Sequence, residues 1–399
     1  MPSRIRHLLT VTAALLAPLV VLCAGIWIGG HPASLPGPLR DVFVSKNVRT
    51  INEAIDVIQQ DYYRRVPRSR LVDNGIGGAV SKLNDRFSRY FDPKEYASFL
   101  ESSAGEFSGV GMQVTEVKAG LRVARTFPGS PAAAAGIKPG DQIVAVNGRS
   151  IAGAPSALTT NLIRGRPGTS VLLTIQSAGK RRTERVKRAQ VDAPSVESKL
   201  RDIGGVKLGV VALSGFTSGA HGEVRQAVDS LRHRGAKGLV LDLRDNGGGL
   251  LDEAVLISSV FVPDGTIVTT RGRTRAEHVY RATGSAIPTK VPVVVLVNGG
   301  SASASEIVTG ALQDRHRAKV VGTHTFGKGV FQEVRELPNG GALDITVGEY
   351  FTPSGRNLGG GGTRRGAGIT PDVRAGDKPR TRADEALDAA LRTLAAESR

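Results

Sequence analysis

The sequence predicts an α+β protein of several domains: an N-terminal membrane segment, a helical region, a β-rich domain and an α/β core. Three observations support this prediction. An apolar N-terminal stretch follows basic residues, short β-like runs separated by turns come next, and buried-strand and helical patterns alternate in the second half of the chain. At 399 residues the chain is long enough for two or three domains, each with its own core.

Residues 1–30 are predicted to be a signal anchor. Arg4 and Arg6 precede an apolar stretch from Leu8 to Gly30, and this charge order places the N-terminus in the cytoplasm and the folded part outside. The stretch is long enough to span a bilayer, which favours a single-pass protein of the cell membrane. Cleavage of the segment, giving a secreted or periplasmic protein, is the second alternative, and a lipoprotein processed at Cys23 is the third.

The next two regions differ in their periodicity. Residues 31–41 are rich in Pro and Gly and form a predicted linker. Helical periodicity dominates residues 42–104, where Asp92-Pro93 signals the start of a short helix. Residues 105–190 contain short β-like runs, and Asn147-Gly148 between them is a tight-turn signal. A helical region followed by a β-rich domain is therefore expected.

The core is expected over residues 195–375. Apolar runs of buried-strand length alternate there with helical patterns, which predicts βαβ units and a largely parallel sheet. The three clearest runs lie at residues 209–213, 238–243 and 291–297. Residues 376–399 form a predicted C-terminal helix and tail.

Charge and cysteine content exclude several classes of function. The chain has 53 Lys and Arg against 36 Asp and Glu, a formal net charge of +17 that favours anionic neighbours such as a membrane surface. The densest basic stretch, residues 180–188, alternates around Val186 like the exposed face of a strand and lacks base-stacking aromatics, so no nucleic-acid partner is predicted. Cys23 is the only cysteine, which excludes an intramolecular disulfide framework and a multi-cysteine metal site. We predict neither a metal nor a cofactor.

One pair of residues indicates a specific chemistry. Ser303 lies among small residues after an apolar run, and Lys328 lies between two glycines, with Gln332 following. A serine with a lysine base is a form of nucleophilic catalysis. The lysine must be neutral near pH 7, which requires burial without a paired carboxylate. Gln332 suits such a site because it accepts a hydrogen bond without adding negative charge.

Other interpretations of these residues are open at this stage. Ser301 and Ser305 flank Ser303, and their hydroxyls are chemically equivalent nucleophiles. The whole segment also fits the pattern of a helix N-cap. Glu306 could cap that helix or buttress the lysine, and the capping pattern favours the first. Four histidines are rival bases, although none has a recognisable nucleophile–base context: His221, His278, His316 and His324.

Seven motifs in order make residues 42–373 resemble the carboxy-terminal processing proteases, a family of Ser-Lys peptidases with an inserted PDZ domain. The resemblance implies a PDZ domain over residues 105–190 and a ClpP/crotonase-like core over 195–375. A Gly- and Arg-rich insertion at 358–365 departs from the family pattern. The motifs are Phe107–Met112, Gly136–Asp141, Leu162–Gly165 with Gly168-Thr169, Leu241–Gly249, Asn298–Glu306, Thr325–Gly329 and Gly368–Asp372.

By this resemblance Ser303 is the nucleophile, Lys328 its general base and Gln332 the residue that orients the lysine. An oxyanion hole needs two N–H donors. The amide after the nucleophile, Ala304, is one candidate, and the resemblance makes Gly249 the other. Asp242 and Arg244, which precede the glycine run, are expected to hold the turn and to take no part in the chemistry.

The resemblance also implies how substrate is captured. A PDZ domain holds a terminal carboxylate in backbone N–H groups, here those of Val110, Gly111 and Met112. Arg164 is a candidate for coupling peptide binding to the protease core. Polypeptides with a free, apolar C-terminus are the implied substrates.

We therefore expect a serine endopeptidase of the carboxy-terminal processing type, cleaving extracytoplasmic polypeptides through a Ser-Lys acyl-enzyme. Two alternatives come from other classes, a non-catalytic PDZ adaptor and a Ser-His hydrolase. Besides substrates and the membrane, the prediction leaves open a regulatory protein or a second copy of the chain as partner.

Overall fold

A computed structural model describes residues 46–177, 179–360, 362, 364, 367–377, 381 and 383–398. The chain divides into two compact units, with the boundary between Leu83 and Asn84. The predicted membrane segment at residues 1–30 and the linker at 31–41 lie outside the described residues. Within the described ranges, no helix is long and apolar enough to cross a bilayer.

Two helices make up the described part of the first unit, α3 (Lys46–Asp61) and α4 (Arg68–Ser81). Pro67 precedes α4, where its fixed φ suits a helix start. Arg68 then donates hydrogen bonds to Asn52 and Gln59 on α3, each at 3.2 Å, and also pairs with Asp56. These contacts join the two helices, as the periodicity of this region predicts.

The second unit begins with a strand that sequence periodicity did not predict, β1 (Arg89–Phe91). It pairs antiparallel with β18 (Ala342–Phe351), with Arg89 opposite Asp344. The predicted helical region up to residue 104 thus also contains one short strand, because three residues are too few to show a period and form a strand only beside a partner. The expected helix after Asp92 is present as α5 (Pro93–Ser103), where Asp92 and Glu95 form a capping box.

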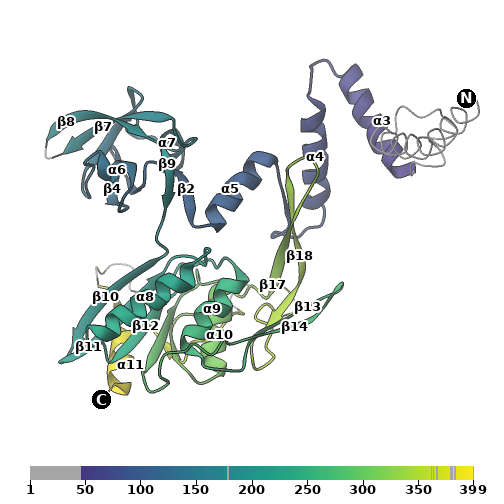
Figure 1. The fold of residues 1–399 in the computed structure, drawn as a ribbon. Coiled ribbons are helices and arrows are strands. Elements are labelled where there is room, and N and C mark those ends of the chain that lie inside the picture. The colour runs from purple at the N-terminus through teal and green to yellow at the C-terminus, as the bar shows by residue number, and fades with distance from the viewer. Residues whose placement is uncertain are drawn as a thin grey trace, which may run out of the picture. The chain divides into compact units, whose positions relative to one another are not determined.

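A small β-rich domain follows (Figure 1). Its main sheet has the order β3-β4-β5-β7-β8, and its buried centre includes Leu121, Ile143 and Leu173. Asn147 and Gly148 both have positive φ, of 50° and 77°, as the predicted tight turn requires. The elements are β2 (Glu106–Gly109), β3 (Met112–Val117), β4 (Gly120–Thr126), α6 (Pro131–Ala134), β5 (Gln142–Val146), β6 (Arg149–Ser150), α7 (Ser156–Ile163), β7 (Ser170–Ser177), β8 (Lys180–Lys187) and β9 (Ala189–Asp192).

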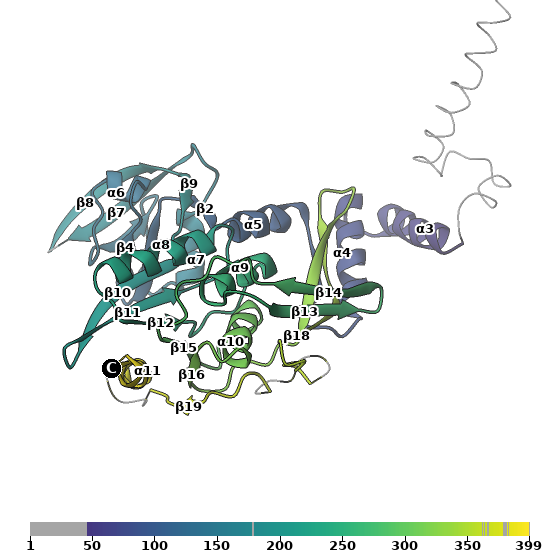
Figure 2. The ribbon, with the colours of Figure 1, turned by 60° about the horizontal axis from the view of Figure 1, so that its bottom comes forward.

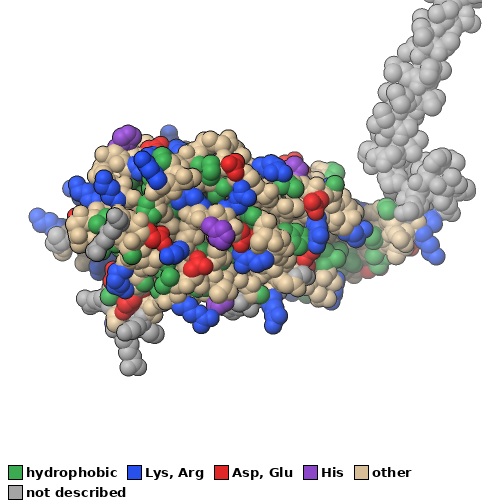
Figure 3. All heavy atoms as spheres, turned by 90° about the horizontal axis from the view of Figure 1, so that it is seen from below, with side chains coloured by type: hydrophobic (Ala, Val, Ile, Leu, Met, Phe, Trp, Pro, Cys, Tyr) green, Lys and Arg blue, Asp and Glu red, His purple; other side chains and the backbone are tan. Residues whose placement is uncertain are grey.

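The basic stretch at residues 180–188 is mostly the exposed strand that its alternation predicts, with Val186 buried. Arg188 is the exception. It is 9% exposed and donates hydrogen bonds to the carbonyl oxygens of Ile163 at 2.8 Å and Ser170 at 2.9 Å. On the face shown in Figure 3, Lys and Arg are scattered among Asp and Glu, as expected of a solvated surface.

The core is built on a six-stranded sheet of order β10-β11-β12-β15-β16-β19. All neighbouring strands are parallel except β10 and β11, which confirms the predicted parallel arrangement. The strands are β10 (Val196–Ile203), β11 (Val206–Leu213), β12 (Gly238–Asp242), β15 (Val293–Val297), β16 (Lys319–Gly322) and β19 (Val373–Arg374). The helices are α8 (Ala220–His233), α9 (Leu251–Phe261), α10 (Ala304–Asp314) and α11 (Glu385–Glu397).

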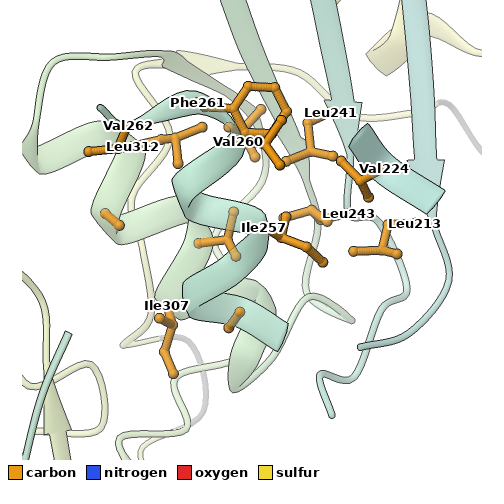
Figure 4. Close-up of a cluster of buried hydrophobic side chains, with 14 of the residues drawn as sticks. Leu213, Val224, Leu241, Leu243, Ile257, Val260, Phe261, Val262, Ile307 and Leu312 are labelled. Atoms are coloured by element: carbon orange, nitrogen blue, oxygen red, sulfur yellow. The ribbon is translucent and has the colours of Figure 1, made fainter. Parts of the chain in front are cut away.

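Helices cover both faces of this sheet (Figure 2). Alternate residues of β12 separate the two layers: Leu241 packs in the cluster with α8, α9 and α10, whereas Val240 packs with α11. Figure 4 shows the first cluster, in which Phe261 and Ile257 of α9 lie against Leu241 and Leu243. Burial on both faces explains why these strands are continuous apolar runs.

A second, antiparallel sheet flanks the core and was not expected from the sequence. It contains β1, β18, β13 (Thr266–Gly272) and β14 (Arg275–Arg281), and β17 (Val330–Glu336) also pairs with β18. Its strands expose many residues, so they lack the apolar runs that mark the central sheet. This sheet matters for the site because β17 begins two residues after Lys328.

Candidate active site

Ser303 lies at the start of helix α10, just beyond the buried strand β15. Its backbone has φ 56° and ψ −114°, a region that non-glycine residues rarely adopt and that must be stabilised by its surroundings. The three neighbouring serines differ in burial. Ser301 and Ser305 are fully buried, and their hydroxyls donate to the carbonyl oxygens of Leu243 at 2.7 Å and Asn246 at 2.8 Å. Of the three, only Ser303 is partly exposed.

A single buried carboxylate joins the serine and the lysine. Glu306 is 0% exposed, and its Oε2 accepts hydrogen bonds from the backbone N–H groups of Ser303 at 2.9 Å and Lys328 at 3.0 Å. Its Oε1 accepts from the Thr325 hydroxyl at 2.6 Å and the Gly327 N–H at 2.7 Å. Glu306 therefore both caps α10 and supports the lysine loop, so the two alternatives drawn from the sequence hold together. Burial raises the pKa of Glu306, and its hydrogen bonds oppose that rise.

Lys328 occupies a partly buried position beside Gln332. Its Nζ donates to Gln332 Oε1 at 2.6 Å, and Gln332 Nε2 donates to the Thr346 hydroxyl at 2.9 Å. Burial lowers the pKa of Lys328, while the negative charges of Asp344, Asp85 and Glu306 oppose that change. Within the described part of the chain Lys328 forms no ion pair. The amine is thus held by a neutral acceptor, as expected of a lysine that must lose its proton.

A glycine loop lies against Ser303. A β-carbon at Gly248, where φ is 104°, would lie 2.9 Å from Ser303 Cβ and 3.0 Å from the Ala304 nitrogen. Gly249 forms a parallel bridge with Phe216, in which the Phe216 N–H donates to the Gly248 carbonyl oxygen and the Phe216 carbonyl oxygen accepts from the Leu250 N–H. The N–H of Gly249 itself faces away from Phe216. Among the described residues, neither this N–H nor that of Ala304 has an acceptor.

Sequence reasoning missed Tyr350, which no motif distinguished. Tyr350 is 1% exposed, and its hydroxyl makes no well-aligned hydrogen bond within the described ranges. Burial raises the pKa of Tyr350 well above its ordinary value, and the charge of Glu306 adds to the rise. The Ser303 side chain acts to lower the pKa of Tyr350, but this effect is the smallest of three. A protonated phenol therefore lies beside the serine.

The residues predicted to hold the turn do so. Arg244 Nε donates to Asp242 Oδ1 at 3.0 Å, and Arg244 Nη1 donates to Asp384 before α11 at 2.7 Å. Hydrogen bonding to Asp242 and Asp384 raises the pKa of Arg244, against the effect of burial. This network fastens the end of β12 to the C-terminal helix.

The rival histidine bases have no hydrogen bond to Ser303 among the described residues. His221 pairs through Nδ1 with Glu253 at 2.9 Å, and His278 packs edge-on against Tyr280 with ring centres 4.4 Å apart. Hydrogen bonds at 3.5 Å join His324 to Thr370 and Arg374. In the part of the chain that is described, no histidine is hydrogen-bonded to a serine.

The loop expected to bind a peptide carboxylate lines a cavity of about 470 Å³. The carbonyl of Val110 accepts from Ala132 at 2.7 Å and that of Gly111 from Phe127 at 3.0 Å, which turns both carbonyls into the domain. The N–H groups of Val110 and Gly111 have no acceptor among the described residues. Met112 lines the same cavity. Arg164 is also in its wall, with Cζ 6.0 Å from the Phe107 ring centre.

The protease core also contributes to this wall. Ser195, Ser214 and Thr217 all line the cavity, and the hydroxyls of Ser195 and Thr217 lie 2.6 Å apart. Thr217 is the neighbour of Phe216, whose backbone pairs with the glycine loop beside Ser303. Neighbouring residues therefore connect the cavity wall at Thr217, through Phe216 and the glycine loop, to Ser303.

Comparison with known proteins agrees with this geometry. Residues 207–375 match Peptidase family S41, residues 100–176 match the PDZ domain, and residues 39–95 match the N-terminal domain of the activating protease CtpB. A protein of Staphylococcus haemolyticus named "Probable CtpA-like serine protease" is 34% identical over 90% of this chain and 71% of its own length. A protein of the same name from Staphylococcus aureus is 36% identical over 82% of this chain and 64% of its own length.

A solved structure is similar as well. The photosystem II D1 C-terminal processing protease shares 29% identity, over 88% of this chain and 98% of that protein, with a TM-score of 0.52. The motifs, the fold and these relatives lead to one assignment. The chain belongs to peptidase family S41 and is a PDZ-containing serine protease of the C-terminal processing type.

Proposed function

We propose that this chain cleaves polypeptides through an acyl-enzyme, with Ser303 as nucleophile, Lys328 as general base and Gln332 orienting the lysine. The observation that carries the proposal is the attachment of Ser303 and Lys328 to one oxygen of Glu306, at 2.9 and 3.0 Å. A serine hydroxyl attacks poorly unless a base removes its proton, and a lysine serves as base only when neutral. The burial that lowers the pKa of Lys328 favours that neutral form.

In acylation, the neutral Nζ of Lys328 takes the hydroxyl proton of Ser303 as Oγ bonds to the scissile carbonyl carbon. The carbonyl oxygen becomes an anion, stabilised by the free N–H groups of Gly249 and Ala304. The Lys328 ammonium then protonates the amide nitrogen, the C–N bond breaks, and the new amino terminus leaves. A water molecule, deprotonated by Lys328, hydrolyses the ester, and Ser303 regains its proton from the lysine.

The proposed substrates are polypeptides with a free, apolar C-terminus, cleaved at or upstream of that end. The terminal carboxylate would be bound by the N–H groups of Val110, Gly111 and Met112, in the mode of β-strand addition that PDZ domains use. The unpaired N–H groups of Val110 and Gly111 and the cavity of about 470 Å³ support this assignment.

Arg164 is the proposed link between peptide binding and the core. It lines the cavity together with Thr217, the neighbour of the residue that pairs with the glycine loop. We expect Arg164→Ala to reduce the stimulation of turnover by an added apolar C-terminal peptide, while the exposed Arg149→Ala leaves it unchanged. Unchanged basal and peptide-stimulated turnover in Arg164→Ala would remove this residue from the proposal.

The test of the catalytic proposal is proteolysis of an unstructured protein with an apolar C-terminus by the full chain, beside Ser303→Ala and Lys328→Ala. Cleavage is expected to vanish in both variants. Cleavage that survives in Lys328→Ala would indicate a histidine base and a Ser-His hydrolase. Tail binding by the wild type without cleavage under all conditions, including added peptide, would favour a PDZ adaptor.

The proposed location is the cell membrane, with residues 1–30 as a single-pass anchor and the catalytic part extracytoplasmic. The basic residues before the apolar stretch support this orientation. An export-dependent reporter fused after residue 399 should be active in cells, and mass spectrometry of the membrane-bound protein should find residues 1–30. An inactive reporter contradicts the orientation, and a mature chain lacking these residues indicates a cleaved signal instead.

A further inference from the structure

A short segment before the PDZ domain lies against the lysine. The segment comprises residues 85–89, is part of the second unit, and runs into the first residue of β1. The ring centre of Phe87 lies 4.6 Å from Lys328 Nζ, and Phe87 is itself partly buried. The guanidinium of Arg86 lies over the same ring, 5.1 Å from its centre. This segment lies outside residues 207–375, the part that matches the peptidase family.

The same segment reaches Gln332 through a chain of hydrogen bonds. Gln332 Nε2 donates to the Thr346 hydroxyl at 2.9 Å, and Thr346 N–H donates to Ser88 Oγ at 3.0 Å. Ser88 in turn donates to Asp85 Oδ2 at 2.6 Å, and the other oxygen of Asp85 accepts from Phe87 N–H at 3.0 Å. Ser88 is 9% exposed, so these bonds are shielded from water.

Strand pairing fixes the segment in place. Arg89 lies opposite Asp344 where β1 pairs with β18, and Arg89 Nε lies 3.4 Å from an Asp344 oxygen. Strand β18 also carries Thr346, and Tyr350 near its end. The segment is therefore attached to the strand that supports the site.

We propose that residues 85–89 form one wall of the catalytic lysine's pocket: Phe87 keeps water from the Lys328 amine, and Ser88 with Asp85 holds Gln332 through Thr346. Phe87 and the Ser88–Asp85 pair are positioning residues, because they contact the lysine and its partners and not the substrate. The inference rests on the proposed role of Lys328 as general base.

The charges around Lys328 determine what loss of Phe87 would do. Asp344, Asp85 and Glu306 favour the charged amine, Arg89 disfavours it, and burial outweighs the three carboxylates. Replacing Phe87 by Ala admits water, removes part of that burial and raises the pKa of Lys328. Loss of the cation–π contact acts in the opposite direction, since the ring attracts the ammonium form. Phe87→Leu separates the effects, because leucine remains apolar and lacks the ring.

The experiment measures kcat and KM of the full chain from pH 6 to 10 with the unstructured protein substrate. In Phe87→Ala the rise of kcat with pH should move to higher pH, with KM unchanged. In Phe87→Leu it should stay or move to lower pH. Ser88→Ala should lower kcat about tenfold by removing one buried acceptor, and Ser88→Thr, which keeps the hydroxyl, should restore it. Phe261→Leu is the control, because Phe261 is buried in the core cluster with Leu241, and no contact between it and Lys328 or residues 85–89 is seen among the described residues.

The inference is overturned if Phe87→Ala keeps the wild-type pH profile, or if Phe261→Leu shifts it equally. Should Phe87→Ala fail to fold, Phe87→Gln allows the same comparison, because glutamine fills more of the space than alanine while attracting water. Failure of the proposed function is distinguishable: Lys328→Ala would then retain cleavage, whatever the Phe87 variants do.

Discussion

Glu306 provides the sharpest test of how this site is assembled. Its carboxylate accepts four hydrogen bonds, from the N–H groups of Ser303, Lys328 and Gly327 and from the Thr325 hydroxyl. In Glu306→Gln the amide oxygen can serve one side only, so the new NH₂ faces two donors, which are the N–H groups of Ser303 and Lys328 or the Gly327 N–H and the Thr325 hydroxyl. Two charge-assisted bonds are lost, each worth about 1.5–3 kcal/mol. Relief from burying a charge offsets part of that loss, which leaves a net destabilisation of about 2–4 kcal/mol.

The loss also affects catalysis, because the same carboxylate holds the backbones of Ser303 and Lys328. If the NH₂ group faces these two donors, the relative position of nucleophile and base changes. A small misplacement of reacting groups costs about 100-fold in rate, and we expect kcat to fall by at least that factor. The KM for an unstructured substrate should change little, since Glu306 is buried and does not reach the surface.

The free energy of unfolding should also change with pH in a direction that the pKa of Glu306 determines. Burial raises the folded-state pKa of Glu306 above its ordinary value of 4.5. The folded chain therefore takes up this proton more readily than the unfolded chain. The resulting stability is fully present below about pH 4.5 and is lost as the pH rises through the folded-state pKa. Because glutamine does not titrate, the stability advantage of the wild type over Glu306→Gln should shrink from pH 4 to pH 7.

Urea unfolding at pH 4, 5.5 and 7 and single-turnover proteolysis measure the two effects separately. Glu253→Gln is the matched control. Glu253 is 6% exposed and accepts backbone N–H bonds from Gly219 and His221 at 2.8 Å, away from Ser303. It should lose stability and retain kcat within a few-fold. A Glu306→Gln variant with wild-type kcat would contradict the role of Glu306 in holding Ser303 and Lys328. A stability difference that widens with pH would contradict the raised pKa of Glu306.

Three further predictions follow from the same geometry. Gly248→Ala should lower kcat about 10²–10³-fold with KM retained, because its β-carbon would lie 3.0 Å from the Ala304 nitrogen. The control Gly129→Ala has open space around its β-carbon and should keep the wild-type kcat. Equal rates for the two variants in steady-state proteolysis would contradict this prediction. Lys328→Met should abolish cleavage and raise the unfolding free energy at pH 7, since the lowered pKa of Lys328 makes its charged form costly in the fold; calorimetry that finds a loss contradicts this. Tyr350→Phe should raise stability by about 1 kcal/mol by removing a buried hydroxyl without an aligned partner, and a drop in denaturation midpoint would contradict that.

The sequence alone determined the parts of the fold that depend on local patterns. Apolar runs such as residues 291–297 predicted the buried parallel strands, because a sheet covered on both faces needs apolar residues throughout. Asp92-Pro93 and Asn147-Gly148 predicted a helix start and a tight turn from backbone chemistry. The order and spacing of the motifs indicated Ser303 and Lys328 as a pair.

The contacts between these elements depend on residues that are distant in sequence and could be seen only in the folded chain. Strand β1 and the antiparallel sheet form through partners distant in sequence, so no short window of residues contained them. The motif had selected Ser303 over Ser301 and Ser305, and the structure adds the physical reason, because Ser301 and Ser305 are fully buried. The double role of Glu306 and the contact of Phe87 with Lys328 depend on chain segments more than 20 and 200 residues apart. A pKa is set by the neighbours that folding brings together, and for Lys328 the charged neighbours come from three separate stretches of the chain, around residues 85–89, 306 and 344.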